Sequence, residues 1–322
     1  MYSAVVTTGI YCRPGCAGRP LPGNVRLYEH PAAAEAAGFR ACLRCRPYRV
    51  AAPVPLRDAP DIVCAAVQLI IGGALDDGGT EEKLAGQVGM SARQLRRLFL
   101  AHLGASPDQL ARSRRAHFAR RLLDDTDLAI ADVAFAAGFG SLRQFNRTMR
   151  EVFRAVPYDL RKRRHKADRL AADGGLALRI PVPPGYDWDG TLAGLAAGAI
   201  PGIEAVTGRV YRRTITVAGA PGLLEVGPGE AASLLLRLHL PYWEGLIHVV
   251  GKVSALIGVE GEPVAWSPAE AAARNALGPA ELAALVTTLG TPVPGLPDGL
   301  THTFPDAAVL TADSLAETGT PR

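Results

Sequence analysis

Two short stretches decide how the first fifty residues fold: Cys12-Arg13-Pro14-Gly15-Cys16 and Cys42-Leu43-Arg44-Cys45. Three residues separate the cysteines of the first pair, two separate those of the second, and 25 residues lie between the pairs. Two such knuckles can close a tetrahedral site, for which four sulfur ligands favour zinc. The spacing also fits an iron–sulfur cluster. A redox pair would need a flanking βαβ pattern, which this sequence does not show.

The rest of the chain is long and unevenly charged. Five cysteines in 322 residues are too few for a disulfide scaffold, and the length favours two or three domains. The sequence contains no signal peptide and no run of 18 apolar residues, so we expect a cytoplasmic, nucleoid-associated protein that does not bind a membrane. Residues 91–169 carry 18 lysines and arginines against eight aspartates and glutamates, whereas residues 170–322 carry eight against 15. The excess of positive charge in residues 91–169 favours binding to the phosphate backbone of a nucleic acid. A solvent-exposed helix surface would show a similar composition.

Composition and periodicity divide the chain into three predicted domains. Residues 1–52 contain the cysteine pairs and are expected to form a small α/β zinc domain, followed by a proline-rich linker at residues 51–60. Residues 61–165 show apolar residues at helical spacing, which predicts an all-α domain. Residues 176–322 contain alternating and β-branched runs, then an alanine-rich pattern, which predicts an α+β domain with a helical remnant and a poorly ordered tail.

The helical segment contains a repeat. Ser91-Ala92-Arg93-Gln94 and Ser141-Leu142-Arg143-Gln144 lie fifty residues apart, and each predicts a capping box that opens a helix. A shorter helix and a glycine turn precede each, which indicates two helix-turn-helix units. We expect the outward-facing residues of the two second helices to bind DNA, because such side chains read base edges: Arg93, Gln94, Arg96 and Arg97, then Arg143, Gln144, Asn146, Arg147 and Arg150. A helical bundle without DNA binding is the alternative.

The cysteine stretches lie in a longer pattern. The run Thr7-Thr8-Gly9-Ile10-Tyr11-Cys12-Arg13-Pro14, joined to Gly38-Phe39-Arg40-Ala41-Cys42, closely resembles the metal-binding domain of Ada-type adaptive-response proteins. The resemblance implies that Cys12, Cys16, Cys42 and Cys45 bind Zn²⁺, and that Cys12 accepts a methyl group from methylated DNA phosphates in a single turnover. We expect four nearby arginines as phosphate contacts: Arg13, Arg40, Arg44 and Arg46. The alternative is a closed zinc site that only stabilises the fold.

Two further resemblances complete the prediction. Residues 61–164 resemble the DNA-binding domain of AraC-type regulators, which implies a specific operator in double-stranded DNA and contact with RNA polymerase. The stretch from Leu178 to Trp188 and the runs after it resemble the N-terminal domain of 3-methyladenine DNA glycosylase II. Excision in that family needs a helix-hairpin-helix and a following Asp, and neither is visible before Arg322, so we expect a truncated portion without this activity. A base-excision glycosylase with an Ada-type regulatory front end is the alternative function.

Overall fold

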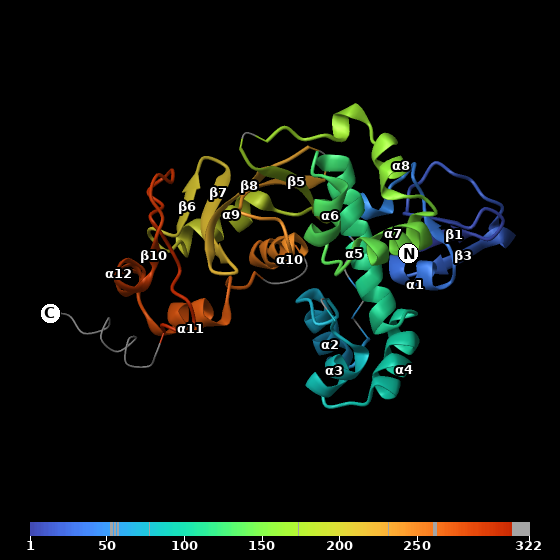
Figure 1. The fold of residues 1–322 in the computed structure, drawn as a ribbon, viewed down its shortest axis with the longest axis horizontal. Helices are drawn as coiled ribbons and strands as arrows, with labels where there is room; N and C mark the ends of the chain where they lie inside the picture. The colour runs from blue at the N-terminus through green and yellow to red at the C-terminus, as the bar shows by residue number, and fades with distance from the viewer. Residues whose placement is uncertain are drawn as a thin grey trace. The chain divides into compact units, whose positions relative to one another are not determined.

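The structure is a computed structural model that describes residues 1–51, 54, 56, 58–76, 78–172, 174–230, 232–259 and 263–310. Residues 52, 53, 55 and 57 of the predicted linker, and residues 311–322 of the predicted tail, lie outside this described part. The chain divides into two compact units, one formed by Met1–Arg169 with Trp243–Gly251, the other by Leu170–Tyr242 with Lys252–Arg322 (Figure 1). Among the described helices, none is both long and apolar enough to cross a membrane.

The first unit begins with a four-stranded sheet of strand order β3-β1-β2-β4. Its elements are β1 (Tyr2–Val5), β2 (Ile10–Cys12), β3 (Val25–Tyr28) and β4 (Arg40–Ala41), with helix α1 (Pro31–Ala36) and the short 3-10 turns η1 (Pro22–Asn24) and η2 (Pro47–Arg49). Strand β1 pairs antiparallel with β2 and β3, whereas β2 and β4 run parallel, with Tyr11 opposite Ala41. Parallel neighbours end at the same edge of a sheet. Cys12, which ends β2, and Cys42, which follows β4, therefore lie side by side.

The rest of the first unit is mainly helical, as its periodicity predicts. It contains α2 (Asp61–Ile71), α3 (Glu81–Gln87), α4 (Ala92–Leu103), α5 (Pro107–Asp125), α6 (Ile130–Ala136), α7 (Leu142–Phe153), α8 (Pro157–Lys162) and the 3-10 turn η3 (Lys166–Asp168). The expected helix-turn-helix units are α3 with α4 and α6 with α7. Gly89 and Gly138 turn the chain within these units at φ values of 72° and 77°, in the left-handed region that glycine adopts without strain. Helix α5 joins the two helix-turn-helix units.

The two predicted capping boxes differ in detail. At α4 the box is complete, because the Gln94 amide donates to Ser91 Oγ at 3.3 Å and the Ser91 amide donates to Gln94 Oε1 at 3.2 Å. At α7 the Gln144 amide donates to Ser141 Oγ at 3.2 Å, but Gln144 Oε1 accepts from the Gly140 amide instead. The backbone explains the difference, since φ is −81° at Ser91 and −160° at Ser141. The second box is therefore only half formed.

Helix α5 lies at the centre of the first unit. It contacts α1, α2, α4, α6, α7, α8 and η2. Near its N-terminus Leu110 and Ala111 join the apolar core that contains Val63 of α2, Leu84 of α3 and Leu95 of α4. A helix that is covered on most sides buries polar residues as well, and the buried set includes Ser113, Arg115, Arg120, Asp124 and Asp125. Such charges require partners inside the protein.

The second unit contains the predicted antiparallel sheet, in the order β5-β9-β8-β7-β6. Its strands are β5 (Leu176–Pro181), β6 (Glu204–Thr207), β7 (Val210–Val217), β8 (Ala220–Pro228) and β9 (Ser233–His239). The remaining elements are α9 (Trp188–Ala197), α10 (Leu246–Leu256), α11 (Pro268–Ala276), α12 (Pro279–Leu289), β10 (Thr291–Pro292) and β11 (His302–Thr303); residues of α10 up to Gly251 belong to the first unit. Sheet and helices together confirm the α+β prediction.

A buried ion cluster ties strands to a helix within the second unit. Arg213 on β7 is fully buried and pairs with Glu204 at 2.8 Å and with Glu270 of α11. Arg274, one turn after Glu270, pairs with Glu270 at 2.9 Å and with Glu204 at 2.6 Å. Two arginines and two carboxylates balance in charge, which is the condition for burying such groups.

Candidate metal centre and nucleic-acid interface

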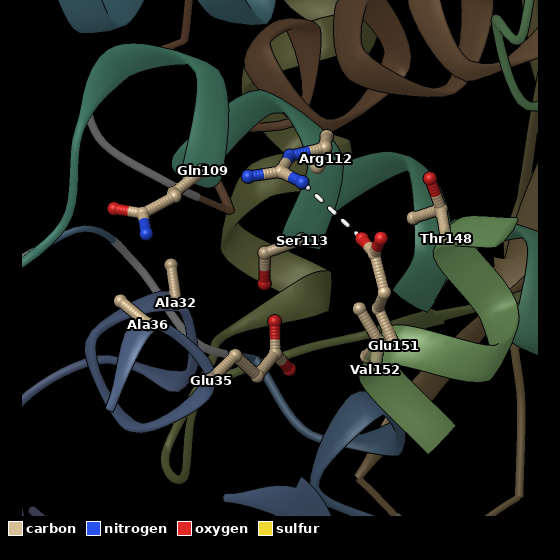
Figure 2. Close-up of a pocket in the computed structure, with 9 residues that line it drawn as sticks. All are labelled: Ala32, Glu35, Ala36, Gln109, Arg112, Ser113, Thr148, Glu151 and Val152. Atoms are coloured by element: carbon tan, nitrogen blue, oxygen red, sulfur yellow. Dashed lines mark hydrogen bonds and ion pairs between the residues drawn. The ribbon is translucent and has the colours of Figure 1, made fainter. Parts of the chain in front are cut away.

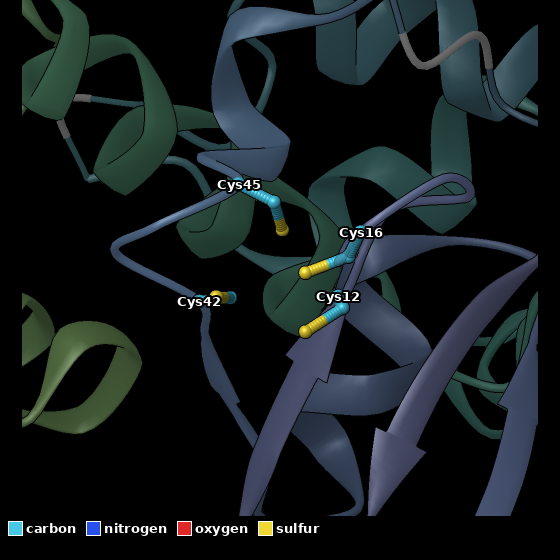
Figure 3. Close-up of side chains that lie close together, drawn as sticks. All are labelled: Cys12, Cys16, Cys42 and Cys45. Atoms are coloured by element: carbon cyan, nitrogen blue, oxygen red, sulfur yellow. The ribbon is translucent and has the colours of Figure 1, made fainter. Parts of the chain in front are cut away.

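The four cysteines of the predicted site meet at one edge of the N-terminal sheet. Their sulfur atoms lie within 4.8 Å of one another, and Figure 3 shows the side chains pointing into one shared space. The amide of Cys42 donates to the carbonyl of Tyr11 at 2.9 Å, so the parallel strand pair fixes Cys42 beside Cys12. The amide of Arg46 donates to the carbonyl of Cys42 at 3.0 Å and closes the second knuckle around Cys45.

Without a cation, two of these thiols, those of Cys12 and Cys45, resist ionisation. Burial raises the pKa of Cys12 far above its ordinary value, and the negative charges of Cys42 and Cys45 raise it further. Burial likewise raises the pKa of Cys45 to about 12. The pKa of Cys16 is lowered, chiefly by a hydrogen bond from the backbone of Gly18. Crowded thiolates repel one another, and a divalent cation among them removes this cost.

The arrangement fits a tetrahedral metal ion. In a four-sulfur site with metal–sulfur bonds of about 2.3 Å, neighbouring sulfurs lie about 3.8 Å apart. The sulfurs of this chain all lie within 4.8 Å of one another, which is close to that spacing. The four cysteines are thus a candidate metal centre. Cys64 lies on α2, away from this cluster, where its thiol faces the Ala59 carbonyl at 3.8 Å.

The four arginines predicted as phosphate contacts occupy different environments. Arg13 and Arg44 are exposed, although Arg13 Nε also donates to the carbonyl of Cys45 at 2.9 Å. Arg40 is half-buried and donates to the Ala41 carbonyl at 3.1 Å. Arg46 is buried and pairs with Asp168 at 2.6 Å. Arg13 and Arg44 therefore remain accessible to a ligand, whereas Arg46 is engaged inside the protein.

The first recognition helix, α4, presents its predicted residues outward. Leu95 and Phe99 are fully buried on its inner face. The outer face carries Arg93, Gln94, Arg96 and Arg97, all of which are exposed. The Arg96 guanidinium pairs with Glu81 of α3 at 2.8 Å, so part of its charge is neutralised locally.

The second recognition helix, α7, is similarly oriented. Phe145 and Met149 are fully buried. The predicted residues Arg143, Arg147 and Arg150 are exposed, while Gln144 and Asn146 are half-buried. The Asn146 amide nitrogen donates to the Leu142 carbonyl at 2.9 Å. The two helices thus display six exposed arginines at the predicted positions. Arg96 pairs with Glu81, and Arg147 lies 3.8 Å from Glu151.

Polar contacts between the cysteine domain and α5 are what sequence reasoning missed. Arg49 pairs with Asp125 at 2.9 Å, and the Tyr48 hydroxyl donates to Asp124 at 3.1 Å. Arg120 pairs with Asp124 at 2.8 Å, and its Nε donates to the Tyr48 hydroxyl at 3.0 Å. We call these five residues the η2–α5 cluster. No spacing rule could have found it, because its two halves lie more than seventy residues apart.

Comparisons with known proteins assign the three segments. Residues 1–48 match the metal binding domain of Ada, residues 84–163 match a helix-turn-helix domain, and residues 177–296 match the AlkA N-terminal domain. These matches confirm the three resemblances and the fold class predicted from the sequence. The domain boundaries at residues 1–52, 61–165 and 176–322 stay predictions.

Two curated proteins are similar to this chain over part of their length. A probable bifunctional transcriptional activator/DNA repair enzyme AlkA of Mycobacterium tuberculosis (strain CDC 1551 / Oshkosh) is 39% identical over 265 residues, which are 81% of this chain and 53% of that protein. The bifunctional transcriptional activator/DNA repair enzyme Ada of Escherichia coli (strain K12) is 33% identical over 175 residues, 54% of this chain and 47% of that protein. This chain therefore spans about half the length of these curated relatives.

One solved structure also matches in sequence. The chain in the crystal structure of the methylated N-ADA/DNA complex is 40% identical, and the match covers 35% of this chain and 84% of that chain with a TM-score of 0.15.

Proposed function

Because the chain joins an Ada-type metal-binding domain, an AraC-type helix-turn-helix region and an AlkA-type N-terminal domain, we propose that it responds to alkylation of DNA. In this proposal Cys12 accepts a methyl group from a methylphosphotriester of double-stranded DNA. The methylated protein then binds a specific operator and contacts RNA polymerase, in the cytoplasm at the nucleoid. The observation that carries the proposal is the convergence of four cysteine sulfurs at one sheet edge, inside the segment that matches Ada.

We assign Zn²⁺ to the four sulfurs, because closed four-sulfur sites in proteins are typically zinc sites. Zinc bound there keeps the thiols ionised at neutral pH, so that Cys12 Sγ is a nucleophile without a general base. Cys16, Cys42 and Cys45 hold the site. The resemblance to Ada-type domains gives the acceptor role to Cys12, which ends β2 and precedes exposed Arg13.

The proposed reaction is an in-line displacement at the methyl carbon. A bond forms between Cys12 Sγ and the methyl carbon as the bond from that carbon to the phosphate oxygen breaks. The negative charge moves from the thiolate to the phosphodiester that leaves, and the thioether remains on the protein. Each molecule therefore reacts once. Exposed Arg13 and Arg44 are suited to hold the phosphate, because guanidinium groups bind phosphate oxygens in bidentate fashion.

Methylation changes the charge of the site. A divalent cation with four thiolates has a formal charge of −2, and methylation of one sulfur makes it −1. Over a screening length of ~8 Å this difference acts directly on nearby DNA phosphates. We therefore expect methylation to raise the affinity for DNA. The two recognition helices would then bind successive major grooves, about 34 Å apart along the duplex.

Mass spectrometry of the intact protein tests this proposal. After incubation with DNA that carries methylphosphotriesters, we expect an increase of about 14 Da, mapped to Cys12. Cys12→Ser should gain no methyl group, while Cys64→Ser, the matched control at the cysteine outside the cluster, should react like the wild type. A wild-type protein that retains its metal and takes up no methyl group would refute the proposal.

The match to the AlkA N-terminal domain favours base excision as a second candidate function. This activity would release free 3-methyladenine from alkylated DNA. Chromatography of the released bases after incubation with the 322-residue chain tests it directly, and it can be scored independently of the methyl adduct on Cys12.

A further inference from the structure

A hydrogen-bonded chain links the strand that carries Cys12 to helix α5. The Tyr11 hydroxyl donates to Glu35 Oε1 at 2.6 Å, and His117 Nε2 lies 2.6 Å from the same oxygen. The Tyr11 oxygen and His117 Nε2 are 3.1 Å apart. Tyr11 belongs to β2, Glu35 to α1 and His117 to α5. Three elements of the first unit therefore meet at one carboxylate oxygen.

The three hydrogen-bonded residues are shielded from solvent, and Glu35 among them is ionised. Tyr11 is fully buried, and the Glu35 side chain is only 8% exposed. Burial by itself raises the pKa of Glu35, but the charge of His117 and hydrogen bonds from His117, Tyr11 and Ser113 outweigh it, so the pKa is lowered. Glu35 is therefore a carboxylate, which can only accept hydrogen bonds. His117 Nε2–H is therefore the donor of the hydrogen bond that Glu35 Oε1 accepts.

Helix α7 closes the surroundings of Glu35. A small cavity of about 110 Å³ lies between α1, α5 and α7, and Figure 2 shows Glu35, Ser113 and Thr148 around it. Arg112 of α5 and Glu151 of α7 line the same cavity and pair at 3.2 Å. These two side chains are partly exposed. The charged groups that face Glu35 thus come from α5 and α7, the helices of the DNA-binding region.

Tyr11 connects Glu35 to the candidate metal centre. It precedes Cys12 on β2, and its carbonyl accepts the hydrogen bond from the amide of Cys42. Strands β2 and β4, the cysteine-bearing strands that end at Cys12 and immediately before Cys42, are thus both fixed by Tyr11, whose hydroxyl Glu35 holds. At the other end, His117 lies in the middle of α5, the helix that joins the two helix-turn-helix units.

We propose that Glu35 is a positioning residue that holds the cysteine-bearing strands against α5, so that methylation of Cys12 is coupled to the placement of both recognition helices on DNA. The inference rests on the proposed function. It adds that the gain in DNA affinity after methylation depends on the hydrogen bonds among Tyr11, Glu35 and His117 as well as on the local change of charge. A Glu35 that serves stability alone would leave that gain unchanged.

The test compares DNA affinity before and after methylation of Cys12. The probe is a duplex of roughly 30 base pairs, long enough for two successive major grooves, selected from a random pool by the methylated wild-type protein. Coupling between sites is commonly worth about 5- to 150-fold in affinity. We expect Glu35→Gln to reduce the ratio of methylated to unmethylated affinity by about tenfold. Metal content and melting temperature are measured on the same samples.

Glu29→Gln is the matched control, because Glu29 is an exposed carboxylate of the same N-terminal domain that lies outside the hydrogen-bonded chain, and its affinity ratio should equal that of the wild type. Should Glu35→Gln lose its metal or unfold, Tyr11→Phe decides, since it removes only one hydroxyl and should also reduce the ratio. An unchanged ratio in a folded, metal-bound variant overturns the inference. A wild-type protein that takes up no methyl group overturns the proposed function instead.

Discussion

Replacing Arg120 with methionine should destabilise the first unit by about 3 kcal/mol. Arg120 is 2% exposed and Asp124 is fully buried, with 2.8 Å between Arg120 Nη2 and Asp124 Oδ1. The substitution leaves the carboxylate buried without its main partner. It also removes the hydrogen bond to the Tyr48 hydroxyl.

The expected loss of stability depends on how well the Asp124 carboxylate is stabilised once Arg120 has been removed. Removing one partner of a buried ion pair typically costs about 3–5 kcal/mol. Arg49 stays 3.4 Å from Asp124, and burial already raises the pKa of Asp124, so the carboxyl group can take up a proton. Both effects limit the cost to the lower end of that range. For a unit of this size, a loss of about 3 kcal/mol lowers the melting temperature by roughly 6–12 °C.

Calorimetry of the metal-loaded protein measures the change. Arg147→Met is the control, because the Arg147 side chain is 66% exposed and its replacement should change stability by less than about 0.5 kcal/mol. The double variant Arg120→Met/Asp124→Leu should lose about 1–3 kcal/mol less than the sum of the two single variants. A single variant as stable as the control, or strictly additive losses, would show that the buried Arg120–Asp124 pair within α5 does not stabilise the first unit.

Three other outcomes are expected. Removing the metal with a strong chelator should unfold the N-terminal sheet, measured by circular dichroism, and expose four additional reactive thiols, measured by thiol titration. An unchanged spectrum contradicts a structural role for the metal. Arg93→Ala and Arg143→Ala, at matching positions of α4 and α7, should each weaken operator binding by about 1–3 kcal/mol in fluorescence anisotropy, and two unaffected variants would exclude these helices as readers. Burial alone would raise the pKa of Glu270, but Arg213 and Arg274 outweigh it, and the pKa is lowered below 4.5. The ionised Glu270 therefore stabilises the folded state fully above that pH, and this contribution is lost as the pH falls through the folded-state pKa. Unfolding of Glu270→Gln, followed by tryptophan fluorescence, should depend less on acid pH than that of the wild type, and parallel curves would refute this.

The candidate metal centre, as a cluster of four cysteines, could be predicted because the information that specifies it is local. The spacing of Cys12 and Cys16, and of Cys42 and Cys45, is a sequence property, and the parallel pairing of β2 with β4 only brings the two knuckles together. The recognition helices were predictable for the same reason, since caps and apolar periodicity act within a few residues. The second capping box departed from its pattern because the backbone at Ser141 is more extended than at Ser91.

The connections between segments were not predictable. Glu35 and His117 are 82 residues apart, and Tyr11 and His117 are 106 apart, so no periodic pattern relates them. Arg46 is an example: its place beside the cysteines in the sequence suggests a phosphate contact, which stays a prediction, and in the fold it pairs with Asp168, 122 residues away. Arg213 on β7 also has a partner remote in the sequence, because Glu270 of α11 lies 57 residues further along the chain.

The face of α5 that receives the cysteine domain has a consequence for protein engineering. His117, Arg120, Asp124 and Asp125 are complementary to particular side chains of residues 1–50. A chimaera that takes its N-terminal domain from a relative and its regulator from this chain will inherit mismatched surfaces unless these four positions are exchanged too. The natural unit of exchange is therefore not the segment between two linkers but the sensor together with the helix on which it rests.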